Sequence, residues 1–190
     1  MSQVLKPVSV AVALWGLGYA LYRSYYALGG TLLLPGTPAD AAQFRLINAA
    51  AVVILAIAAV LPIAMLPLWQ RPKVRPVLLV LCWVVAVGCI MHALIDGIQR
   101  ILSLAGLLII EYPAGVWASI DHRAADLQDL FFNEPWFLLE GLGYAALGWI
   151  ALGPGGRRRW WVGSAVAAIL VLTVIGLLSA TGVIGRVIIG

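Results

Sequence analysis

Long apolar stretches separated by short polar segments dominate the chain. A helix needs about 20 apolar residues to cross a hydrocarbon core about 30 Å thick, and five stretches are long enough. They cover residues 8–28, 46–68, 76–95, 135–152 and 160–180. None alternates as a strand would, and a chain in lipid must satisfy its backbone polar groups internally. The pattern therefore predicts an all-α fold, residues 1–190 forming one polytopic bundle of about five transmembrane helices.

Composition supports the same class. The 190 residues are 63% hydrophobic and 11% charged, with a mean hydropathy of +1.03. Soluble domains carry about 25% charged residues, so this chain has too little charge to cover a soluble globule. We expect a multi-pass protein of the cell membrane that contacts membrane lipid and has no nucleic-acid partner.

Basic residues predict the orientation, because Lys and Arg in short loops resist translocation. They collect before the first stretch, between the second and third, and between the fourth and fifth: Lys6, Arg71, Lys73, Arg75, Arg157, Arg158 and Arg159. With five crossings these places share one side. The amino terminus is therefore predicted to be cytoplasmic, and the acidic segment 96–134 lies outside.

The third stretch carries a ladder of ionisable residues and is expected to continue as a helix to residue 110. His92, Asp96 and Arg100 recur every fourth residue, so they share one face of that helix. Ionisable residues inside the hydrocarbon usually mark a site or pathway, which favours a functional role. The alternative is an interfacial ion pair between Asp96 and Arg100, with His92 hydrogen-bonded between helices.

The fourth stretch supplies a buried acid. Asn133 and Glu134 are expected to open this helix as cap and first-turn acid, before Pro135. Glu140 lies about two turns deeper, where a bare carboxylate costs several kcal/mol unless it is paired or protonated. We expect Glu140 to act as a proton donor or carrier, with Tyr144 one turn further along as its hydrogen-bond partner.

Tyr22, Arg23 and Tyr26 lie near the outer end of the first stretch and share one broad face with Tyr19. Arg23 is a candidate partner for the carboxylates described above, or it extends to the interface with its aliphatic stem in lipid. The tyrosines either line a site or form the outer aromatic belt.

Segment 111–132 is too polar to cross a membrane. Its acidic residues alternate with apolar ones, which predicts a short amphipathic helix on the outer surface. We expect this segment to be a connector or a lid over a cavity between the helices.

No metal or cofactor is expected from the cysteines and histidines. Cys82 and Cys89 lie seven residues apart on one predicted helix, too far to bridge. His92 and His122 are the only histidines, and no HExxH or CxxC spacing is present.

Two windows carry a resemblance to a known family. The first is Trp15 to Gly30, ending Tyr25-Tyr26-Ala27-Leu28-Gly29-Gly30-Thr31, and the second is Asn133-Glu134-Pro135-Trp136-Phe137-Leu138-Leu139 followed by Gly141. They resemble a family of small, largely actinobacterial, polytopic integral membrane proteins of uncharacterised function. The resemblance implies a bacterial membrane protein and carries no activity. The family pattern has a His in the first helix, where this chain has Tyr19 or Tyr22.

Two functional hypotheses follow from these residues. The first is a membrane enzyme that converts a lipidic or small hydrophobic substrate by acid–base chemistry, as an isomerase or cyclase does. Glu140 would be the acid, His92 with Asp96 the base, Arg23 and Arg100 the charge partners, and Trp136, Trp149 and the tyrosines the aromatic walls. The remaining substrate-binding candidates are Tyr22, Tyr26, Glu134 and Tyr144. The alternative is a small transporter or accessory subunit in which the same residues are structural.

Overall fold

The computed structural model describes residues 2–112 and 115–184, and its long elements are helices. The long helices are α1 (Ser2–Ala27), α2 (Ala41–Ala64), α3 (Arg75–Leu104), α5 (Glu134–Leu152) and α6 (Gly156–Ala180). The short elements are β1 (Gly36–Pro38), η1 (Leu68–Gln70), β2 (Trp117–Ile120), α4 (His122–Gln128) and η2 (Asp129–Asn133). Five helical segments are long and apolar enough to span a membrane. The predicted all-α class and the number of such helices are thus confirmed.

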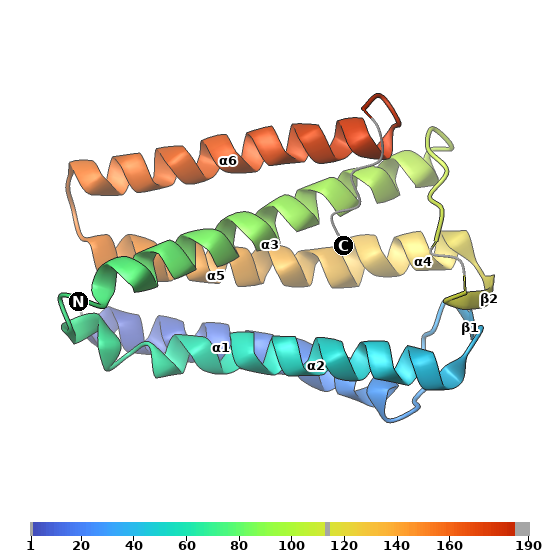
Figure 1. The fold of residues 1–190 in the computed structure, drawn as a ribbon, viewed down its shortest axis with the longest axis horizontal. Coiled ribbons are helices and arrows are strands. Elements are labelled where there is room, and N and C mark those ends of the chain that lie inside the picture. Colours follow the sequence, from blue (N-terminus) through green and yellow to red (C-terminus); the bar gives the residue numbers. More distant parts are fainter. Residues whose placement is uncertain (1, 113–114, 185–190) are drawn as a thin grey trace.

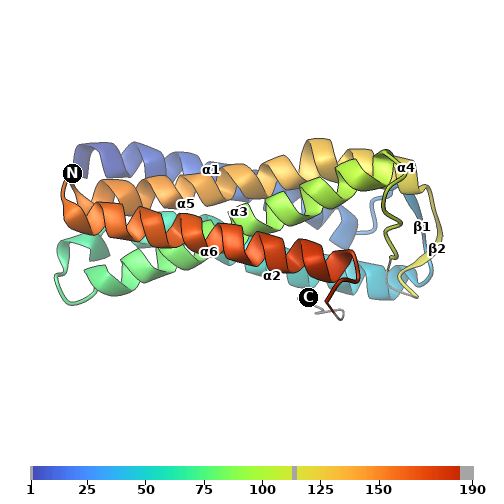
Figure 2. The same cartoon turned by 90° about the horizontal axis from the view of Figure 1, so that it is seen from above.

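The long helices run roughly along a common direction and alternate in sense (Figure 1). α1 packs along α2, α3 packs along α5, and α1 also contacts α5, which joins the two pairs. α6 lies on the outer side of α3 (Figures 1 and 2). The four helices α1, α2, α3 and α5 therefore form the body of the bundle.

The basic loops meet at one end of the bundle, beside the start of α1 (Figure 1). Arg75 donates a hydrogen bond to the carbonyl of Ala151, so it holds α3 against the end of α5. The guanidinium of Arg158 bonds the Trp149 carbonyl at 2.8 Å and lies 4.0 Å from the centroid of its indole. We call this the basic end.

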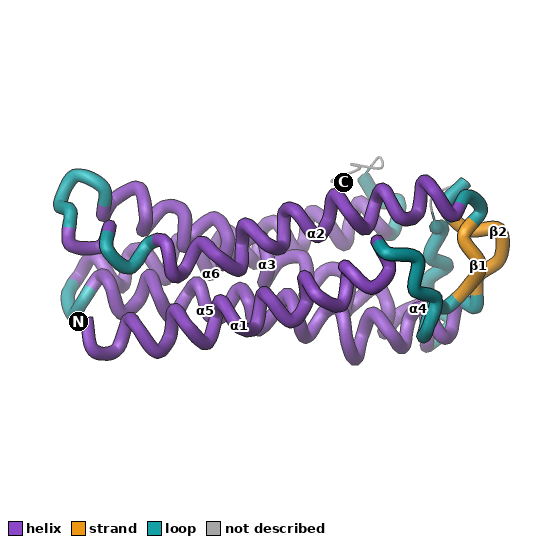
Figure 3. Tube along the Cα trace, turned by 90° about the horizontal axis from the view of Figure 1, so that it is seen from below, coloured by secondary structure: helices purple, strands orange, loops and turns teal. Residues whose placement is uncertain are grey.

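The opposite end carries the two strands, which Figure 3 shows in orange. β1 and β2 pair antiparallel, with Gly36 opposite Ile120 and Thr37 opposite Ser119. The amide of Asp121 also donates to the Pro35 carbonyl at 2.7 Å. The loop after α1 is thereby tied to the loop after α3, and the pair covers what we call the acidic end.

The predicted surface connector is wrong over its second half. Residues 122–133 do not lie as a separate surface helix. They form the first turns of a continuous helix, His122–Leu152, in which the π-helical turn η2 joins α4 to α5. A helix of 31 residues is about 46 Å long, whereas the hydrocarbon core is about 30 Å thick. The polar turns can therefore extend beyond the lipid without leaving the helix.

Because the fourth membrane helix begins at His122, the residue that caps it also differs from the prediction. Asn133 was expected to cap a helix that starts at Pro135, but its side chain makes no capping bond. Instead, Asp121 caps α4, where its carboxylate accepts from the amide of Ala124 at 3.0 Å. The third helix also ends earlier than predicted, at Leu104 and not at residue 110.

Apolar side chains fill the half of the bundle near the basic end. The buried cluster there comprises Leu5, Val12, Met65, Trp69, Leu78, Cys82, Ala86, Tyr144, Leu147 and Ala151. Large apolar side chains are also exposed along the outer faces; on α2 alone these include Val53, Ile54, Ile57 and Val60, each at least 60% exposed. Soluble monomers rarely expose apolar patches of this extent, whereas a lipid-facing surface requires them.

Glycines permit the close contacts between helices. A Cβ atom at Gly141 in α5 would lie 2.7 Å from Ile90 Cγ1 and 3.1 Å from the Ile90 amide nitrogen, both in α3. A Cβ at Gly16 in α1 would lie 3.2 Å from Ala59 in α2. Small residues at such positions are a common means of packing helices in membranes. The recurring sequence Gly-Leu-Gly-Tyr-Ala at 16–20 and 141–145 therefore has a packing explanation at both sites.

Gly141→Ala should destabilise the bundle, because the added methyl group meets both a side chain and the backbone of α3. Overpacking of this kind costs about 1–3 kcal/mol. The matched control is Gly163→Ala in α6, where nothing lies within 4 Å of an added Cβ; its effect should be neutral or stabilising, because Ala favours helix. Thermal and SDS unfolding of both variants in detergent would check this. Equal stabilities would contradict the close α3–α5 contact.

Candidate functional site

A charge network at the acidic end joins α3 to the fourth membrane helix, which is the continuous helix His122–Leu152 that contains α4, η2 and α5. Arg100 of α3 bonds Asp129 at 2.8 Å and Asp126 at 3.2 Å. Ser103, one turn further along α3, donates a hydrogen bond of 2.6 Å to the other oxygen of Asp126. Asp126 is only 2% exposed. It had been expected on a solvated connector, and the paired guanidinium is what allows its burial.

Arg100 does not complete the ladder that its spacing suggested. Its guanidinium turns toward the fourth helix and lies 3.1 Å from the Tyr112 hydroxyl. Burial raises the pKa of Tyr112 to about 12, against the lowering effect of the Arg100 guanidinium. The phenol therefore remains protonated at neutral pH. Within the described residues, no ion pair joins Asp96 to Arg100 at 4.0 Å or less.

The tyrosines of α1 form a second polar row against the fourth helix. Tyr19 donates a 3.2 Å hydrogen bond to Asn133, whose amide in turn bonds Asp129 at 2.5 Å. The Tyr22 hydroxyl accepts a 2.7 Å bond from Gln128 and lies 3.2 Å from the hydroxyl of Tyr26. Tyr26 is 2% exposed. Tyr22 and Tyr26 thus face the interior of the acidic end.

A cavity of about 200 Å³ lies between these elements. Its polar lining is Tyr22, Arg23, Tyr26, Asn48, Tyr112, Gln128, Asp129 and Asn133. Its apolar lining comes from the loop after α1, from α2 and α4, and from the β2 segment: Leu34, Pro35, Phe44, Ile47, Val116, Trp117, Ile120 and Ala125. We call it the outer cavity.

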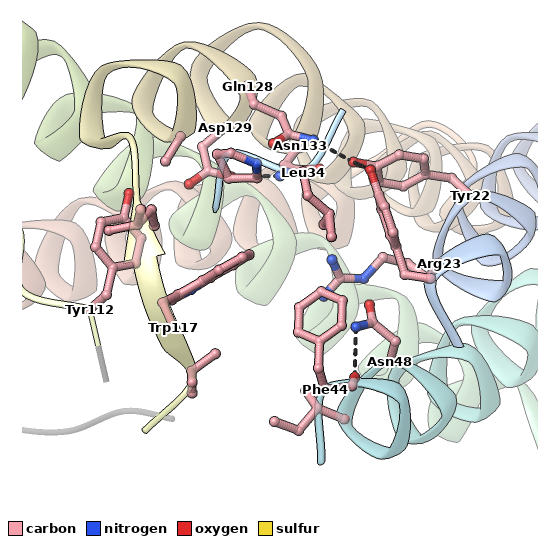
Figure 4. Close-up of a pocket in the computed structure, with 16 residues that line it drawn as sticks. Tyr22, Arg23, Leu34, Phe44, Asn48, Tyr112, Trp117, Gln128, Asp129 and Asn133 are labelled. Carbon is pink, nitrogen blue, oxygen red and sulfur yellow. Dashed lines mark hydrogen bonds between the residues drawn. The ribbon is translucent and has the colours of Figure 1, made fainter. Parts of the chain in front are cut away.

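Arg23 extends into the outer cavity toward Phe44 and Asn48, as Figure 4 shows. Among the described residues its guanidinium makes no ion pair or hydrogen bond, so it pairs with none of the carboxylates proposed as partners. Asn48 is 1% exposed, and its amide nitrogen donates to the Phe44 carbonyl at 2.9 Å. Its side-chain oxygen has no hydrogen-bond partner among residues 2–112 and 115–184. A donor and an acceptor thus remain unsatisfied beside one cavity.

A third cluster lies where α3 meets α5. His92 Nε2 is 3.6 Å from Asp96 Oδ2 and 3.8 Å from Glu134 Oε2. Both separations exceed hydrogen-bond distance. The imidazole ring contacts Phe137 edge-on, with a centroid separation of 4.5 Å. The structure therefore confirms the juxtaposition of His92 and Asp96 and adds Glu134 from a second helix.

Glu140 is buried but separate from this cluster. It follows Glu134 by six residues, a rotation of about 240° around the helix axis, so the two acids project from different faces. Its carboxylate lies against α1, where a Cβ at Gly16 would be 3.3 Å from Oε1. Among the described residues, neither carboxylate oxygen has a hydrogen-bond partner. The acid and base expected to act together are thus not joined by contact.

The remaining predicted residues have structural contacts. Tyr144 is fully buried, but it donates its hydroxyl proton to the Ala58 carbonyl at 2.7 Å and not to Glu140. Trp136 stacks on Trp15 at 4.3 Å, and each indole N–H donates to the other residue's carbonyl. Trp149 lines a separate apolar cavity of about 280 Å³ between α3, α5 and α6.

Several site residues were missed in the sequence. The sequence pattern places Asp129 in a surface connector and Asn133 at a helix cap, and it singles out none of Asn48, Gln128 and Tyr112. A signal for the first two was present, because 126, 129 and 133 repeat at helical spacing and continue the fourth helix. No comparable pattern marked Asn48, which is a lone polar residue in an apolar stretch.

A scan against protein-family models and searches of curated proteins and of solved structures each gave no match.

Arg100→Gln should destabilise the protein by about 3–5 kcal/mol, because it leaves the buried Asp126 without its cation. Arg123→Gln is the matched control: Arg123 is exposed at the same end, and its replacement should change stability by less than about 0.5 kcal/mol. Adding Asp126→Asn to Arg100→Gln should restore part of the loss. Denaturant unfolding of the purified variants measures this. Similar stabilities for the two single variants would contradict the pairing.

Proposed function

We propose that this protein is a multi-pass membrane protein that binds an amphiphilic molecule with an anionic head group in the outer cavity. Five helices of sufficient length and apolarity support insertion into a membrane. The basic loops gathered at one end support a cytoplasmic amino terminus, with the outer cavity at the other face. We assign the protein to the cell membrane, where the excess of Lys and Arg in cytoplasmic loops sets the orientation of membrane proteins.

The observation that carries the binding proposal is the unpaired guanidinium of Arg23 in the outer cavity. Arg23 is partly buried among the aromatic and polar groups that line the cavity, and an anion would offset the cost of removing its guanidinium from water. A carboxylate or phosphate group would accept its hydrogen bonds. A hydroxyl on the same ligand would satisfy the free oxygen of Asn48.

The size and position of the cavity indicate which part of the ligand it holds. A volume of about 200 Å³ is below the roughly 300–1,000 Å³ of sites that enclose a drug-sized molecule. The cavity therefore suits a head group, with the hydrophobic part of the ligand lying along the apolar outer surface of the helices. Such a ligand would come from the outer leaflet.

One observation favours a second candidate, acid–base conversion of the bound molecule. The His92–Asp96–Glu134 cluster adjoins the outer cavity in sequence, because Glu134 follows Asn133. An imidazole between two carboxylates can exchange protons with a substrate. A transporter or accessory subunit remains the non-enzymatic alternative, and the Arg100 network is consistent with it because the guanidinium pairs with carboxylates of this chain.

Orientation can be tested with single cysteines in a variant that lacks Cys82 and Cys89. We expect a membrane-impermeant maleimide to label Arg123→Cys in intact cells and to label Lys73→Cys only after lysis, since the two residues lie at opposite ends of the bundle. The reverse pattern would overturn the proposed orientation. Labelling of both in intact cells would argue against a membrane barrier between them.

Ligand binding can be tested by mass spectrometry of lipid extracts from the purified protein. We expect an anionic amphiphile to co-purify with the wild type and with Arg123→Gln. Arg23→Gln should retain at least about tenfold less, since charged hydrogen bonds contribute about 1.5–3 kcal/mol. Equal retention by all three proteins would contradict the proposal. Conversion of the extracted molecule by the wild type but not by His92→Ala would favour the enzyme, and no conversion by either would favour a binding protein.

A further inference from the structure

Three potential metal ligands converge where α3 meets α5. His92 Nε2 and carboxylate oxygens of Asp96 and Glu134 all lie within 4.8 Å of one another. His92 and Asp96 come from the same face of α3, four residues apart, and Glu134 comes from the first turn of α5. Because two helices contribute, the grouping is invisible in the linear spacing of the sequence.

The distances favour a common ligand over pairwise hydrogen bonds. Nε2 lies 3.6 Å from Asp96 and 3.8 Å from Glu134, too far to donate its proton to either. In a tetrahedral site with metal–ligand bonds of about 2.0–2.2 Å, neighbouring ligand atoms are about 3.3–3.6 Å apart. The 3.6 Å separation lies at the upper limit of this range and the 3.8 Å separation slightly beyond it, and rotation of the partly exposed His92 and Asp96 side chains can close the difference.

Glu134 supplies a second, independent observation. Its side chain is only 8% exposed and its Oε2 points at His92, and within the part of the chain that the structure describes that atom has no hydrogen-bond partner. A buried carboxylate without a partner is costly, and the Arg100 guanidinium, which could neutralise it, is already bonded to Asp126 and Asp129. A divalent cation would balance the charges of Asp96 and Glu134 and occupy the free oxygen.

We propose that His92, Asp96 and Glu134 bind one divalent transition-metal ion. One imidazole and two carboxylates form a ligand set that suits zinc or manganese better than the soft metals that prefer thiolates. The His92 side chain is 43% exposed and that of Asp96 31%, so an ion can enter and at least one coordination position stays open to water or another ligand. Three protein ligands with an open position are typical of catalytic zinc sites.

The structural setting is suited to holding such an ion. Phe137 packs edge-on against the imidazole ring and gives it an apolar neighbour from α5. The π-helical turn η2 directly precedes Glu134 and sets the direction in which its side chain projects. Turns of this type inside α-helices are frequent at functional sites. This proposal does not depend on a ligand in the outer cavity.

The site can be tested on the full chain in detergent after chelation and removal of the chelator. We expect zinc titration by calorimetry to give one equivalent bound, cobalt to show the visible absorption of a low-symmetry site, and zinc to raise the melting temperature. His92→Ala and Glu134→Gln should weaken zinc binding by at least the roughly 10- to 100-fold that even outer-shell changes cause.

His122→Ala is the matched control, because His122 is the other histidine, is exposed and contacts Tyr112 at the same end of the bundle. It should bind zinc as the wild type does. Glu134→Gln keeps the side-chain shape, so it reports on ligation even if His92→Ala fails to fold. A folded wild type that binds neither zinc, cobalt nor manganese overturns the proposal, as does binding that both site variants retain or that His122→Ala abolishes.

Discussion

The pairing of Arg100 with Asp126 and Asp129 is the interaction on which the acidic end depends. One guanidinium bridges α3 to two successive turns of the fourth membrane helix. Without that cation, Asp126 could not be buried at 2% exposure. The network therefore permits a polar helix start to pack into a bundle whose other half is almost entirely apolar, and it fixes the place where Asn133 and Glu134 project.

Glu140 shows the opposite treatment of a carboxyl group. It lies between α1 and α5 with both oxygens unpaired, and glycine at position 16 leaves the space that its side chain requires. A lone carboxyl group in such surroundings is far less costly as the neutral acid than as the anion. The chain thus accommodates these two buried acids in different ways. Asp126 is paired with a cation, whereas Glu140 has no charged partner among the described residues and is less costly to bury as the neutral acid.

The helices were predictable because lipid imposes a length and an apolar composition that any sequence must display. The start of the fourth membrane helix could not be predicted in this way. Pro135 fits the first turn of a helix, and the sequence alone gives Asp126 no buried partner, because Arg100 lies in a distant segment. Proline had no effect on the boundary because η2 carries the helix through this region. The helical spacing of residues 126, 129 and 133 is a local sign of the longer helix, but the pairing with Arg100 from a distant segment is what allows these turns to be buried.

The candidate site, like the fourth membrane helix, could be predicted only in part. His92 and Asp96 share a face by spacing alone, so their proximity followed from the helix period. The proximity of Glu134 to His92 did not follow from the helix period, because the rotation of α5 against α3 determines whether Glu134 or Glu140 faces the imidazole. Depth in the apolar stretch favours Glu140 as the acid, whereas the position of Glu134 before Pro135 fits a helix start as well as a binding site. The observed rotation brings Glu134 to His92 and directs Glu140 toward α1.

The short segment Asp129–Glu134 links the two proposed sites. Asn133 lines the outer cavity and bonds Tyr19, and the next residue, Glu134, faces His92 on α3. Neighbouring helical residues project about 100° apart, so one turn of backbone can serve two sites. A change in η2 would disturb both, whereas Arg23 belongs only to the cavity and His92 only to the cluster. Substitutions at those two residues can therefore separate the contributions of the two sites.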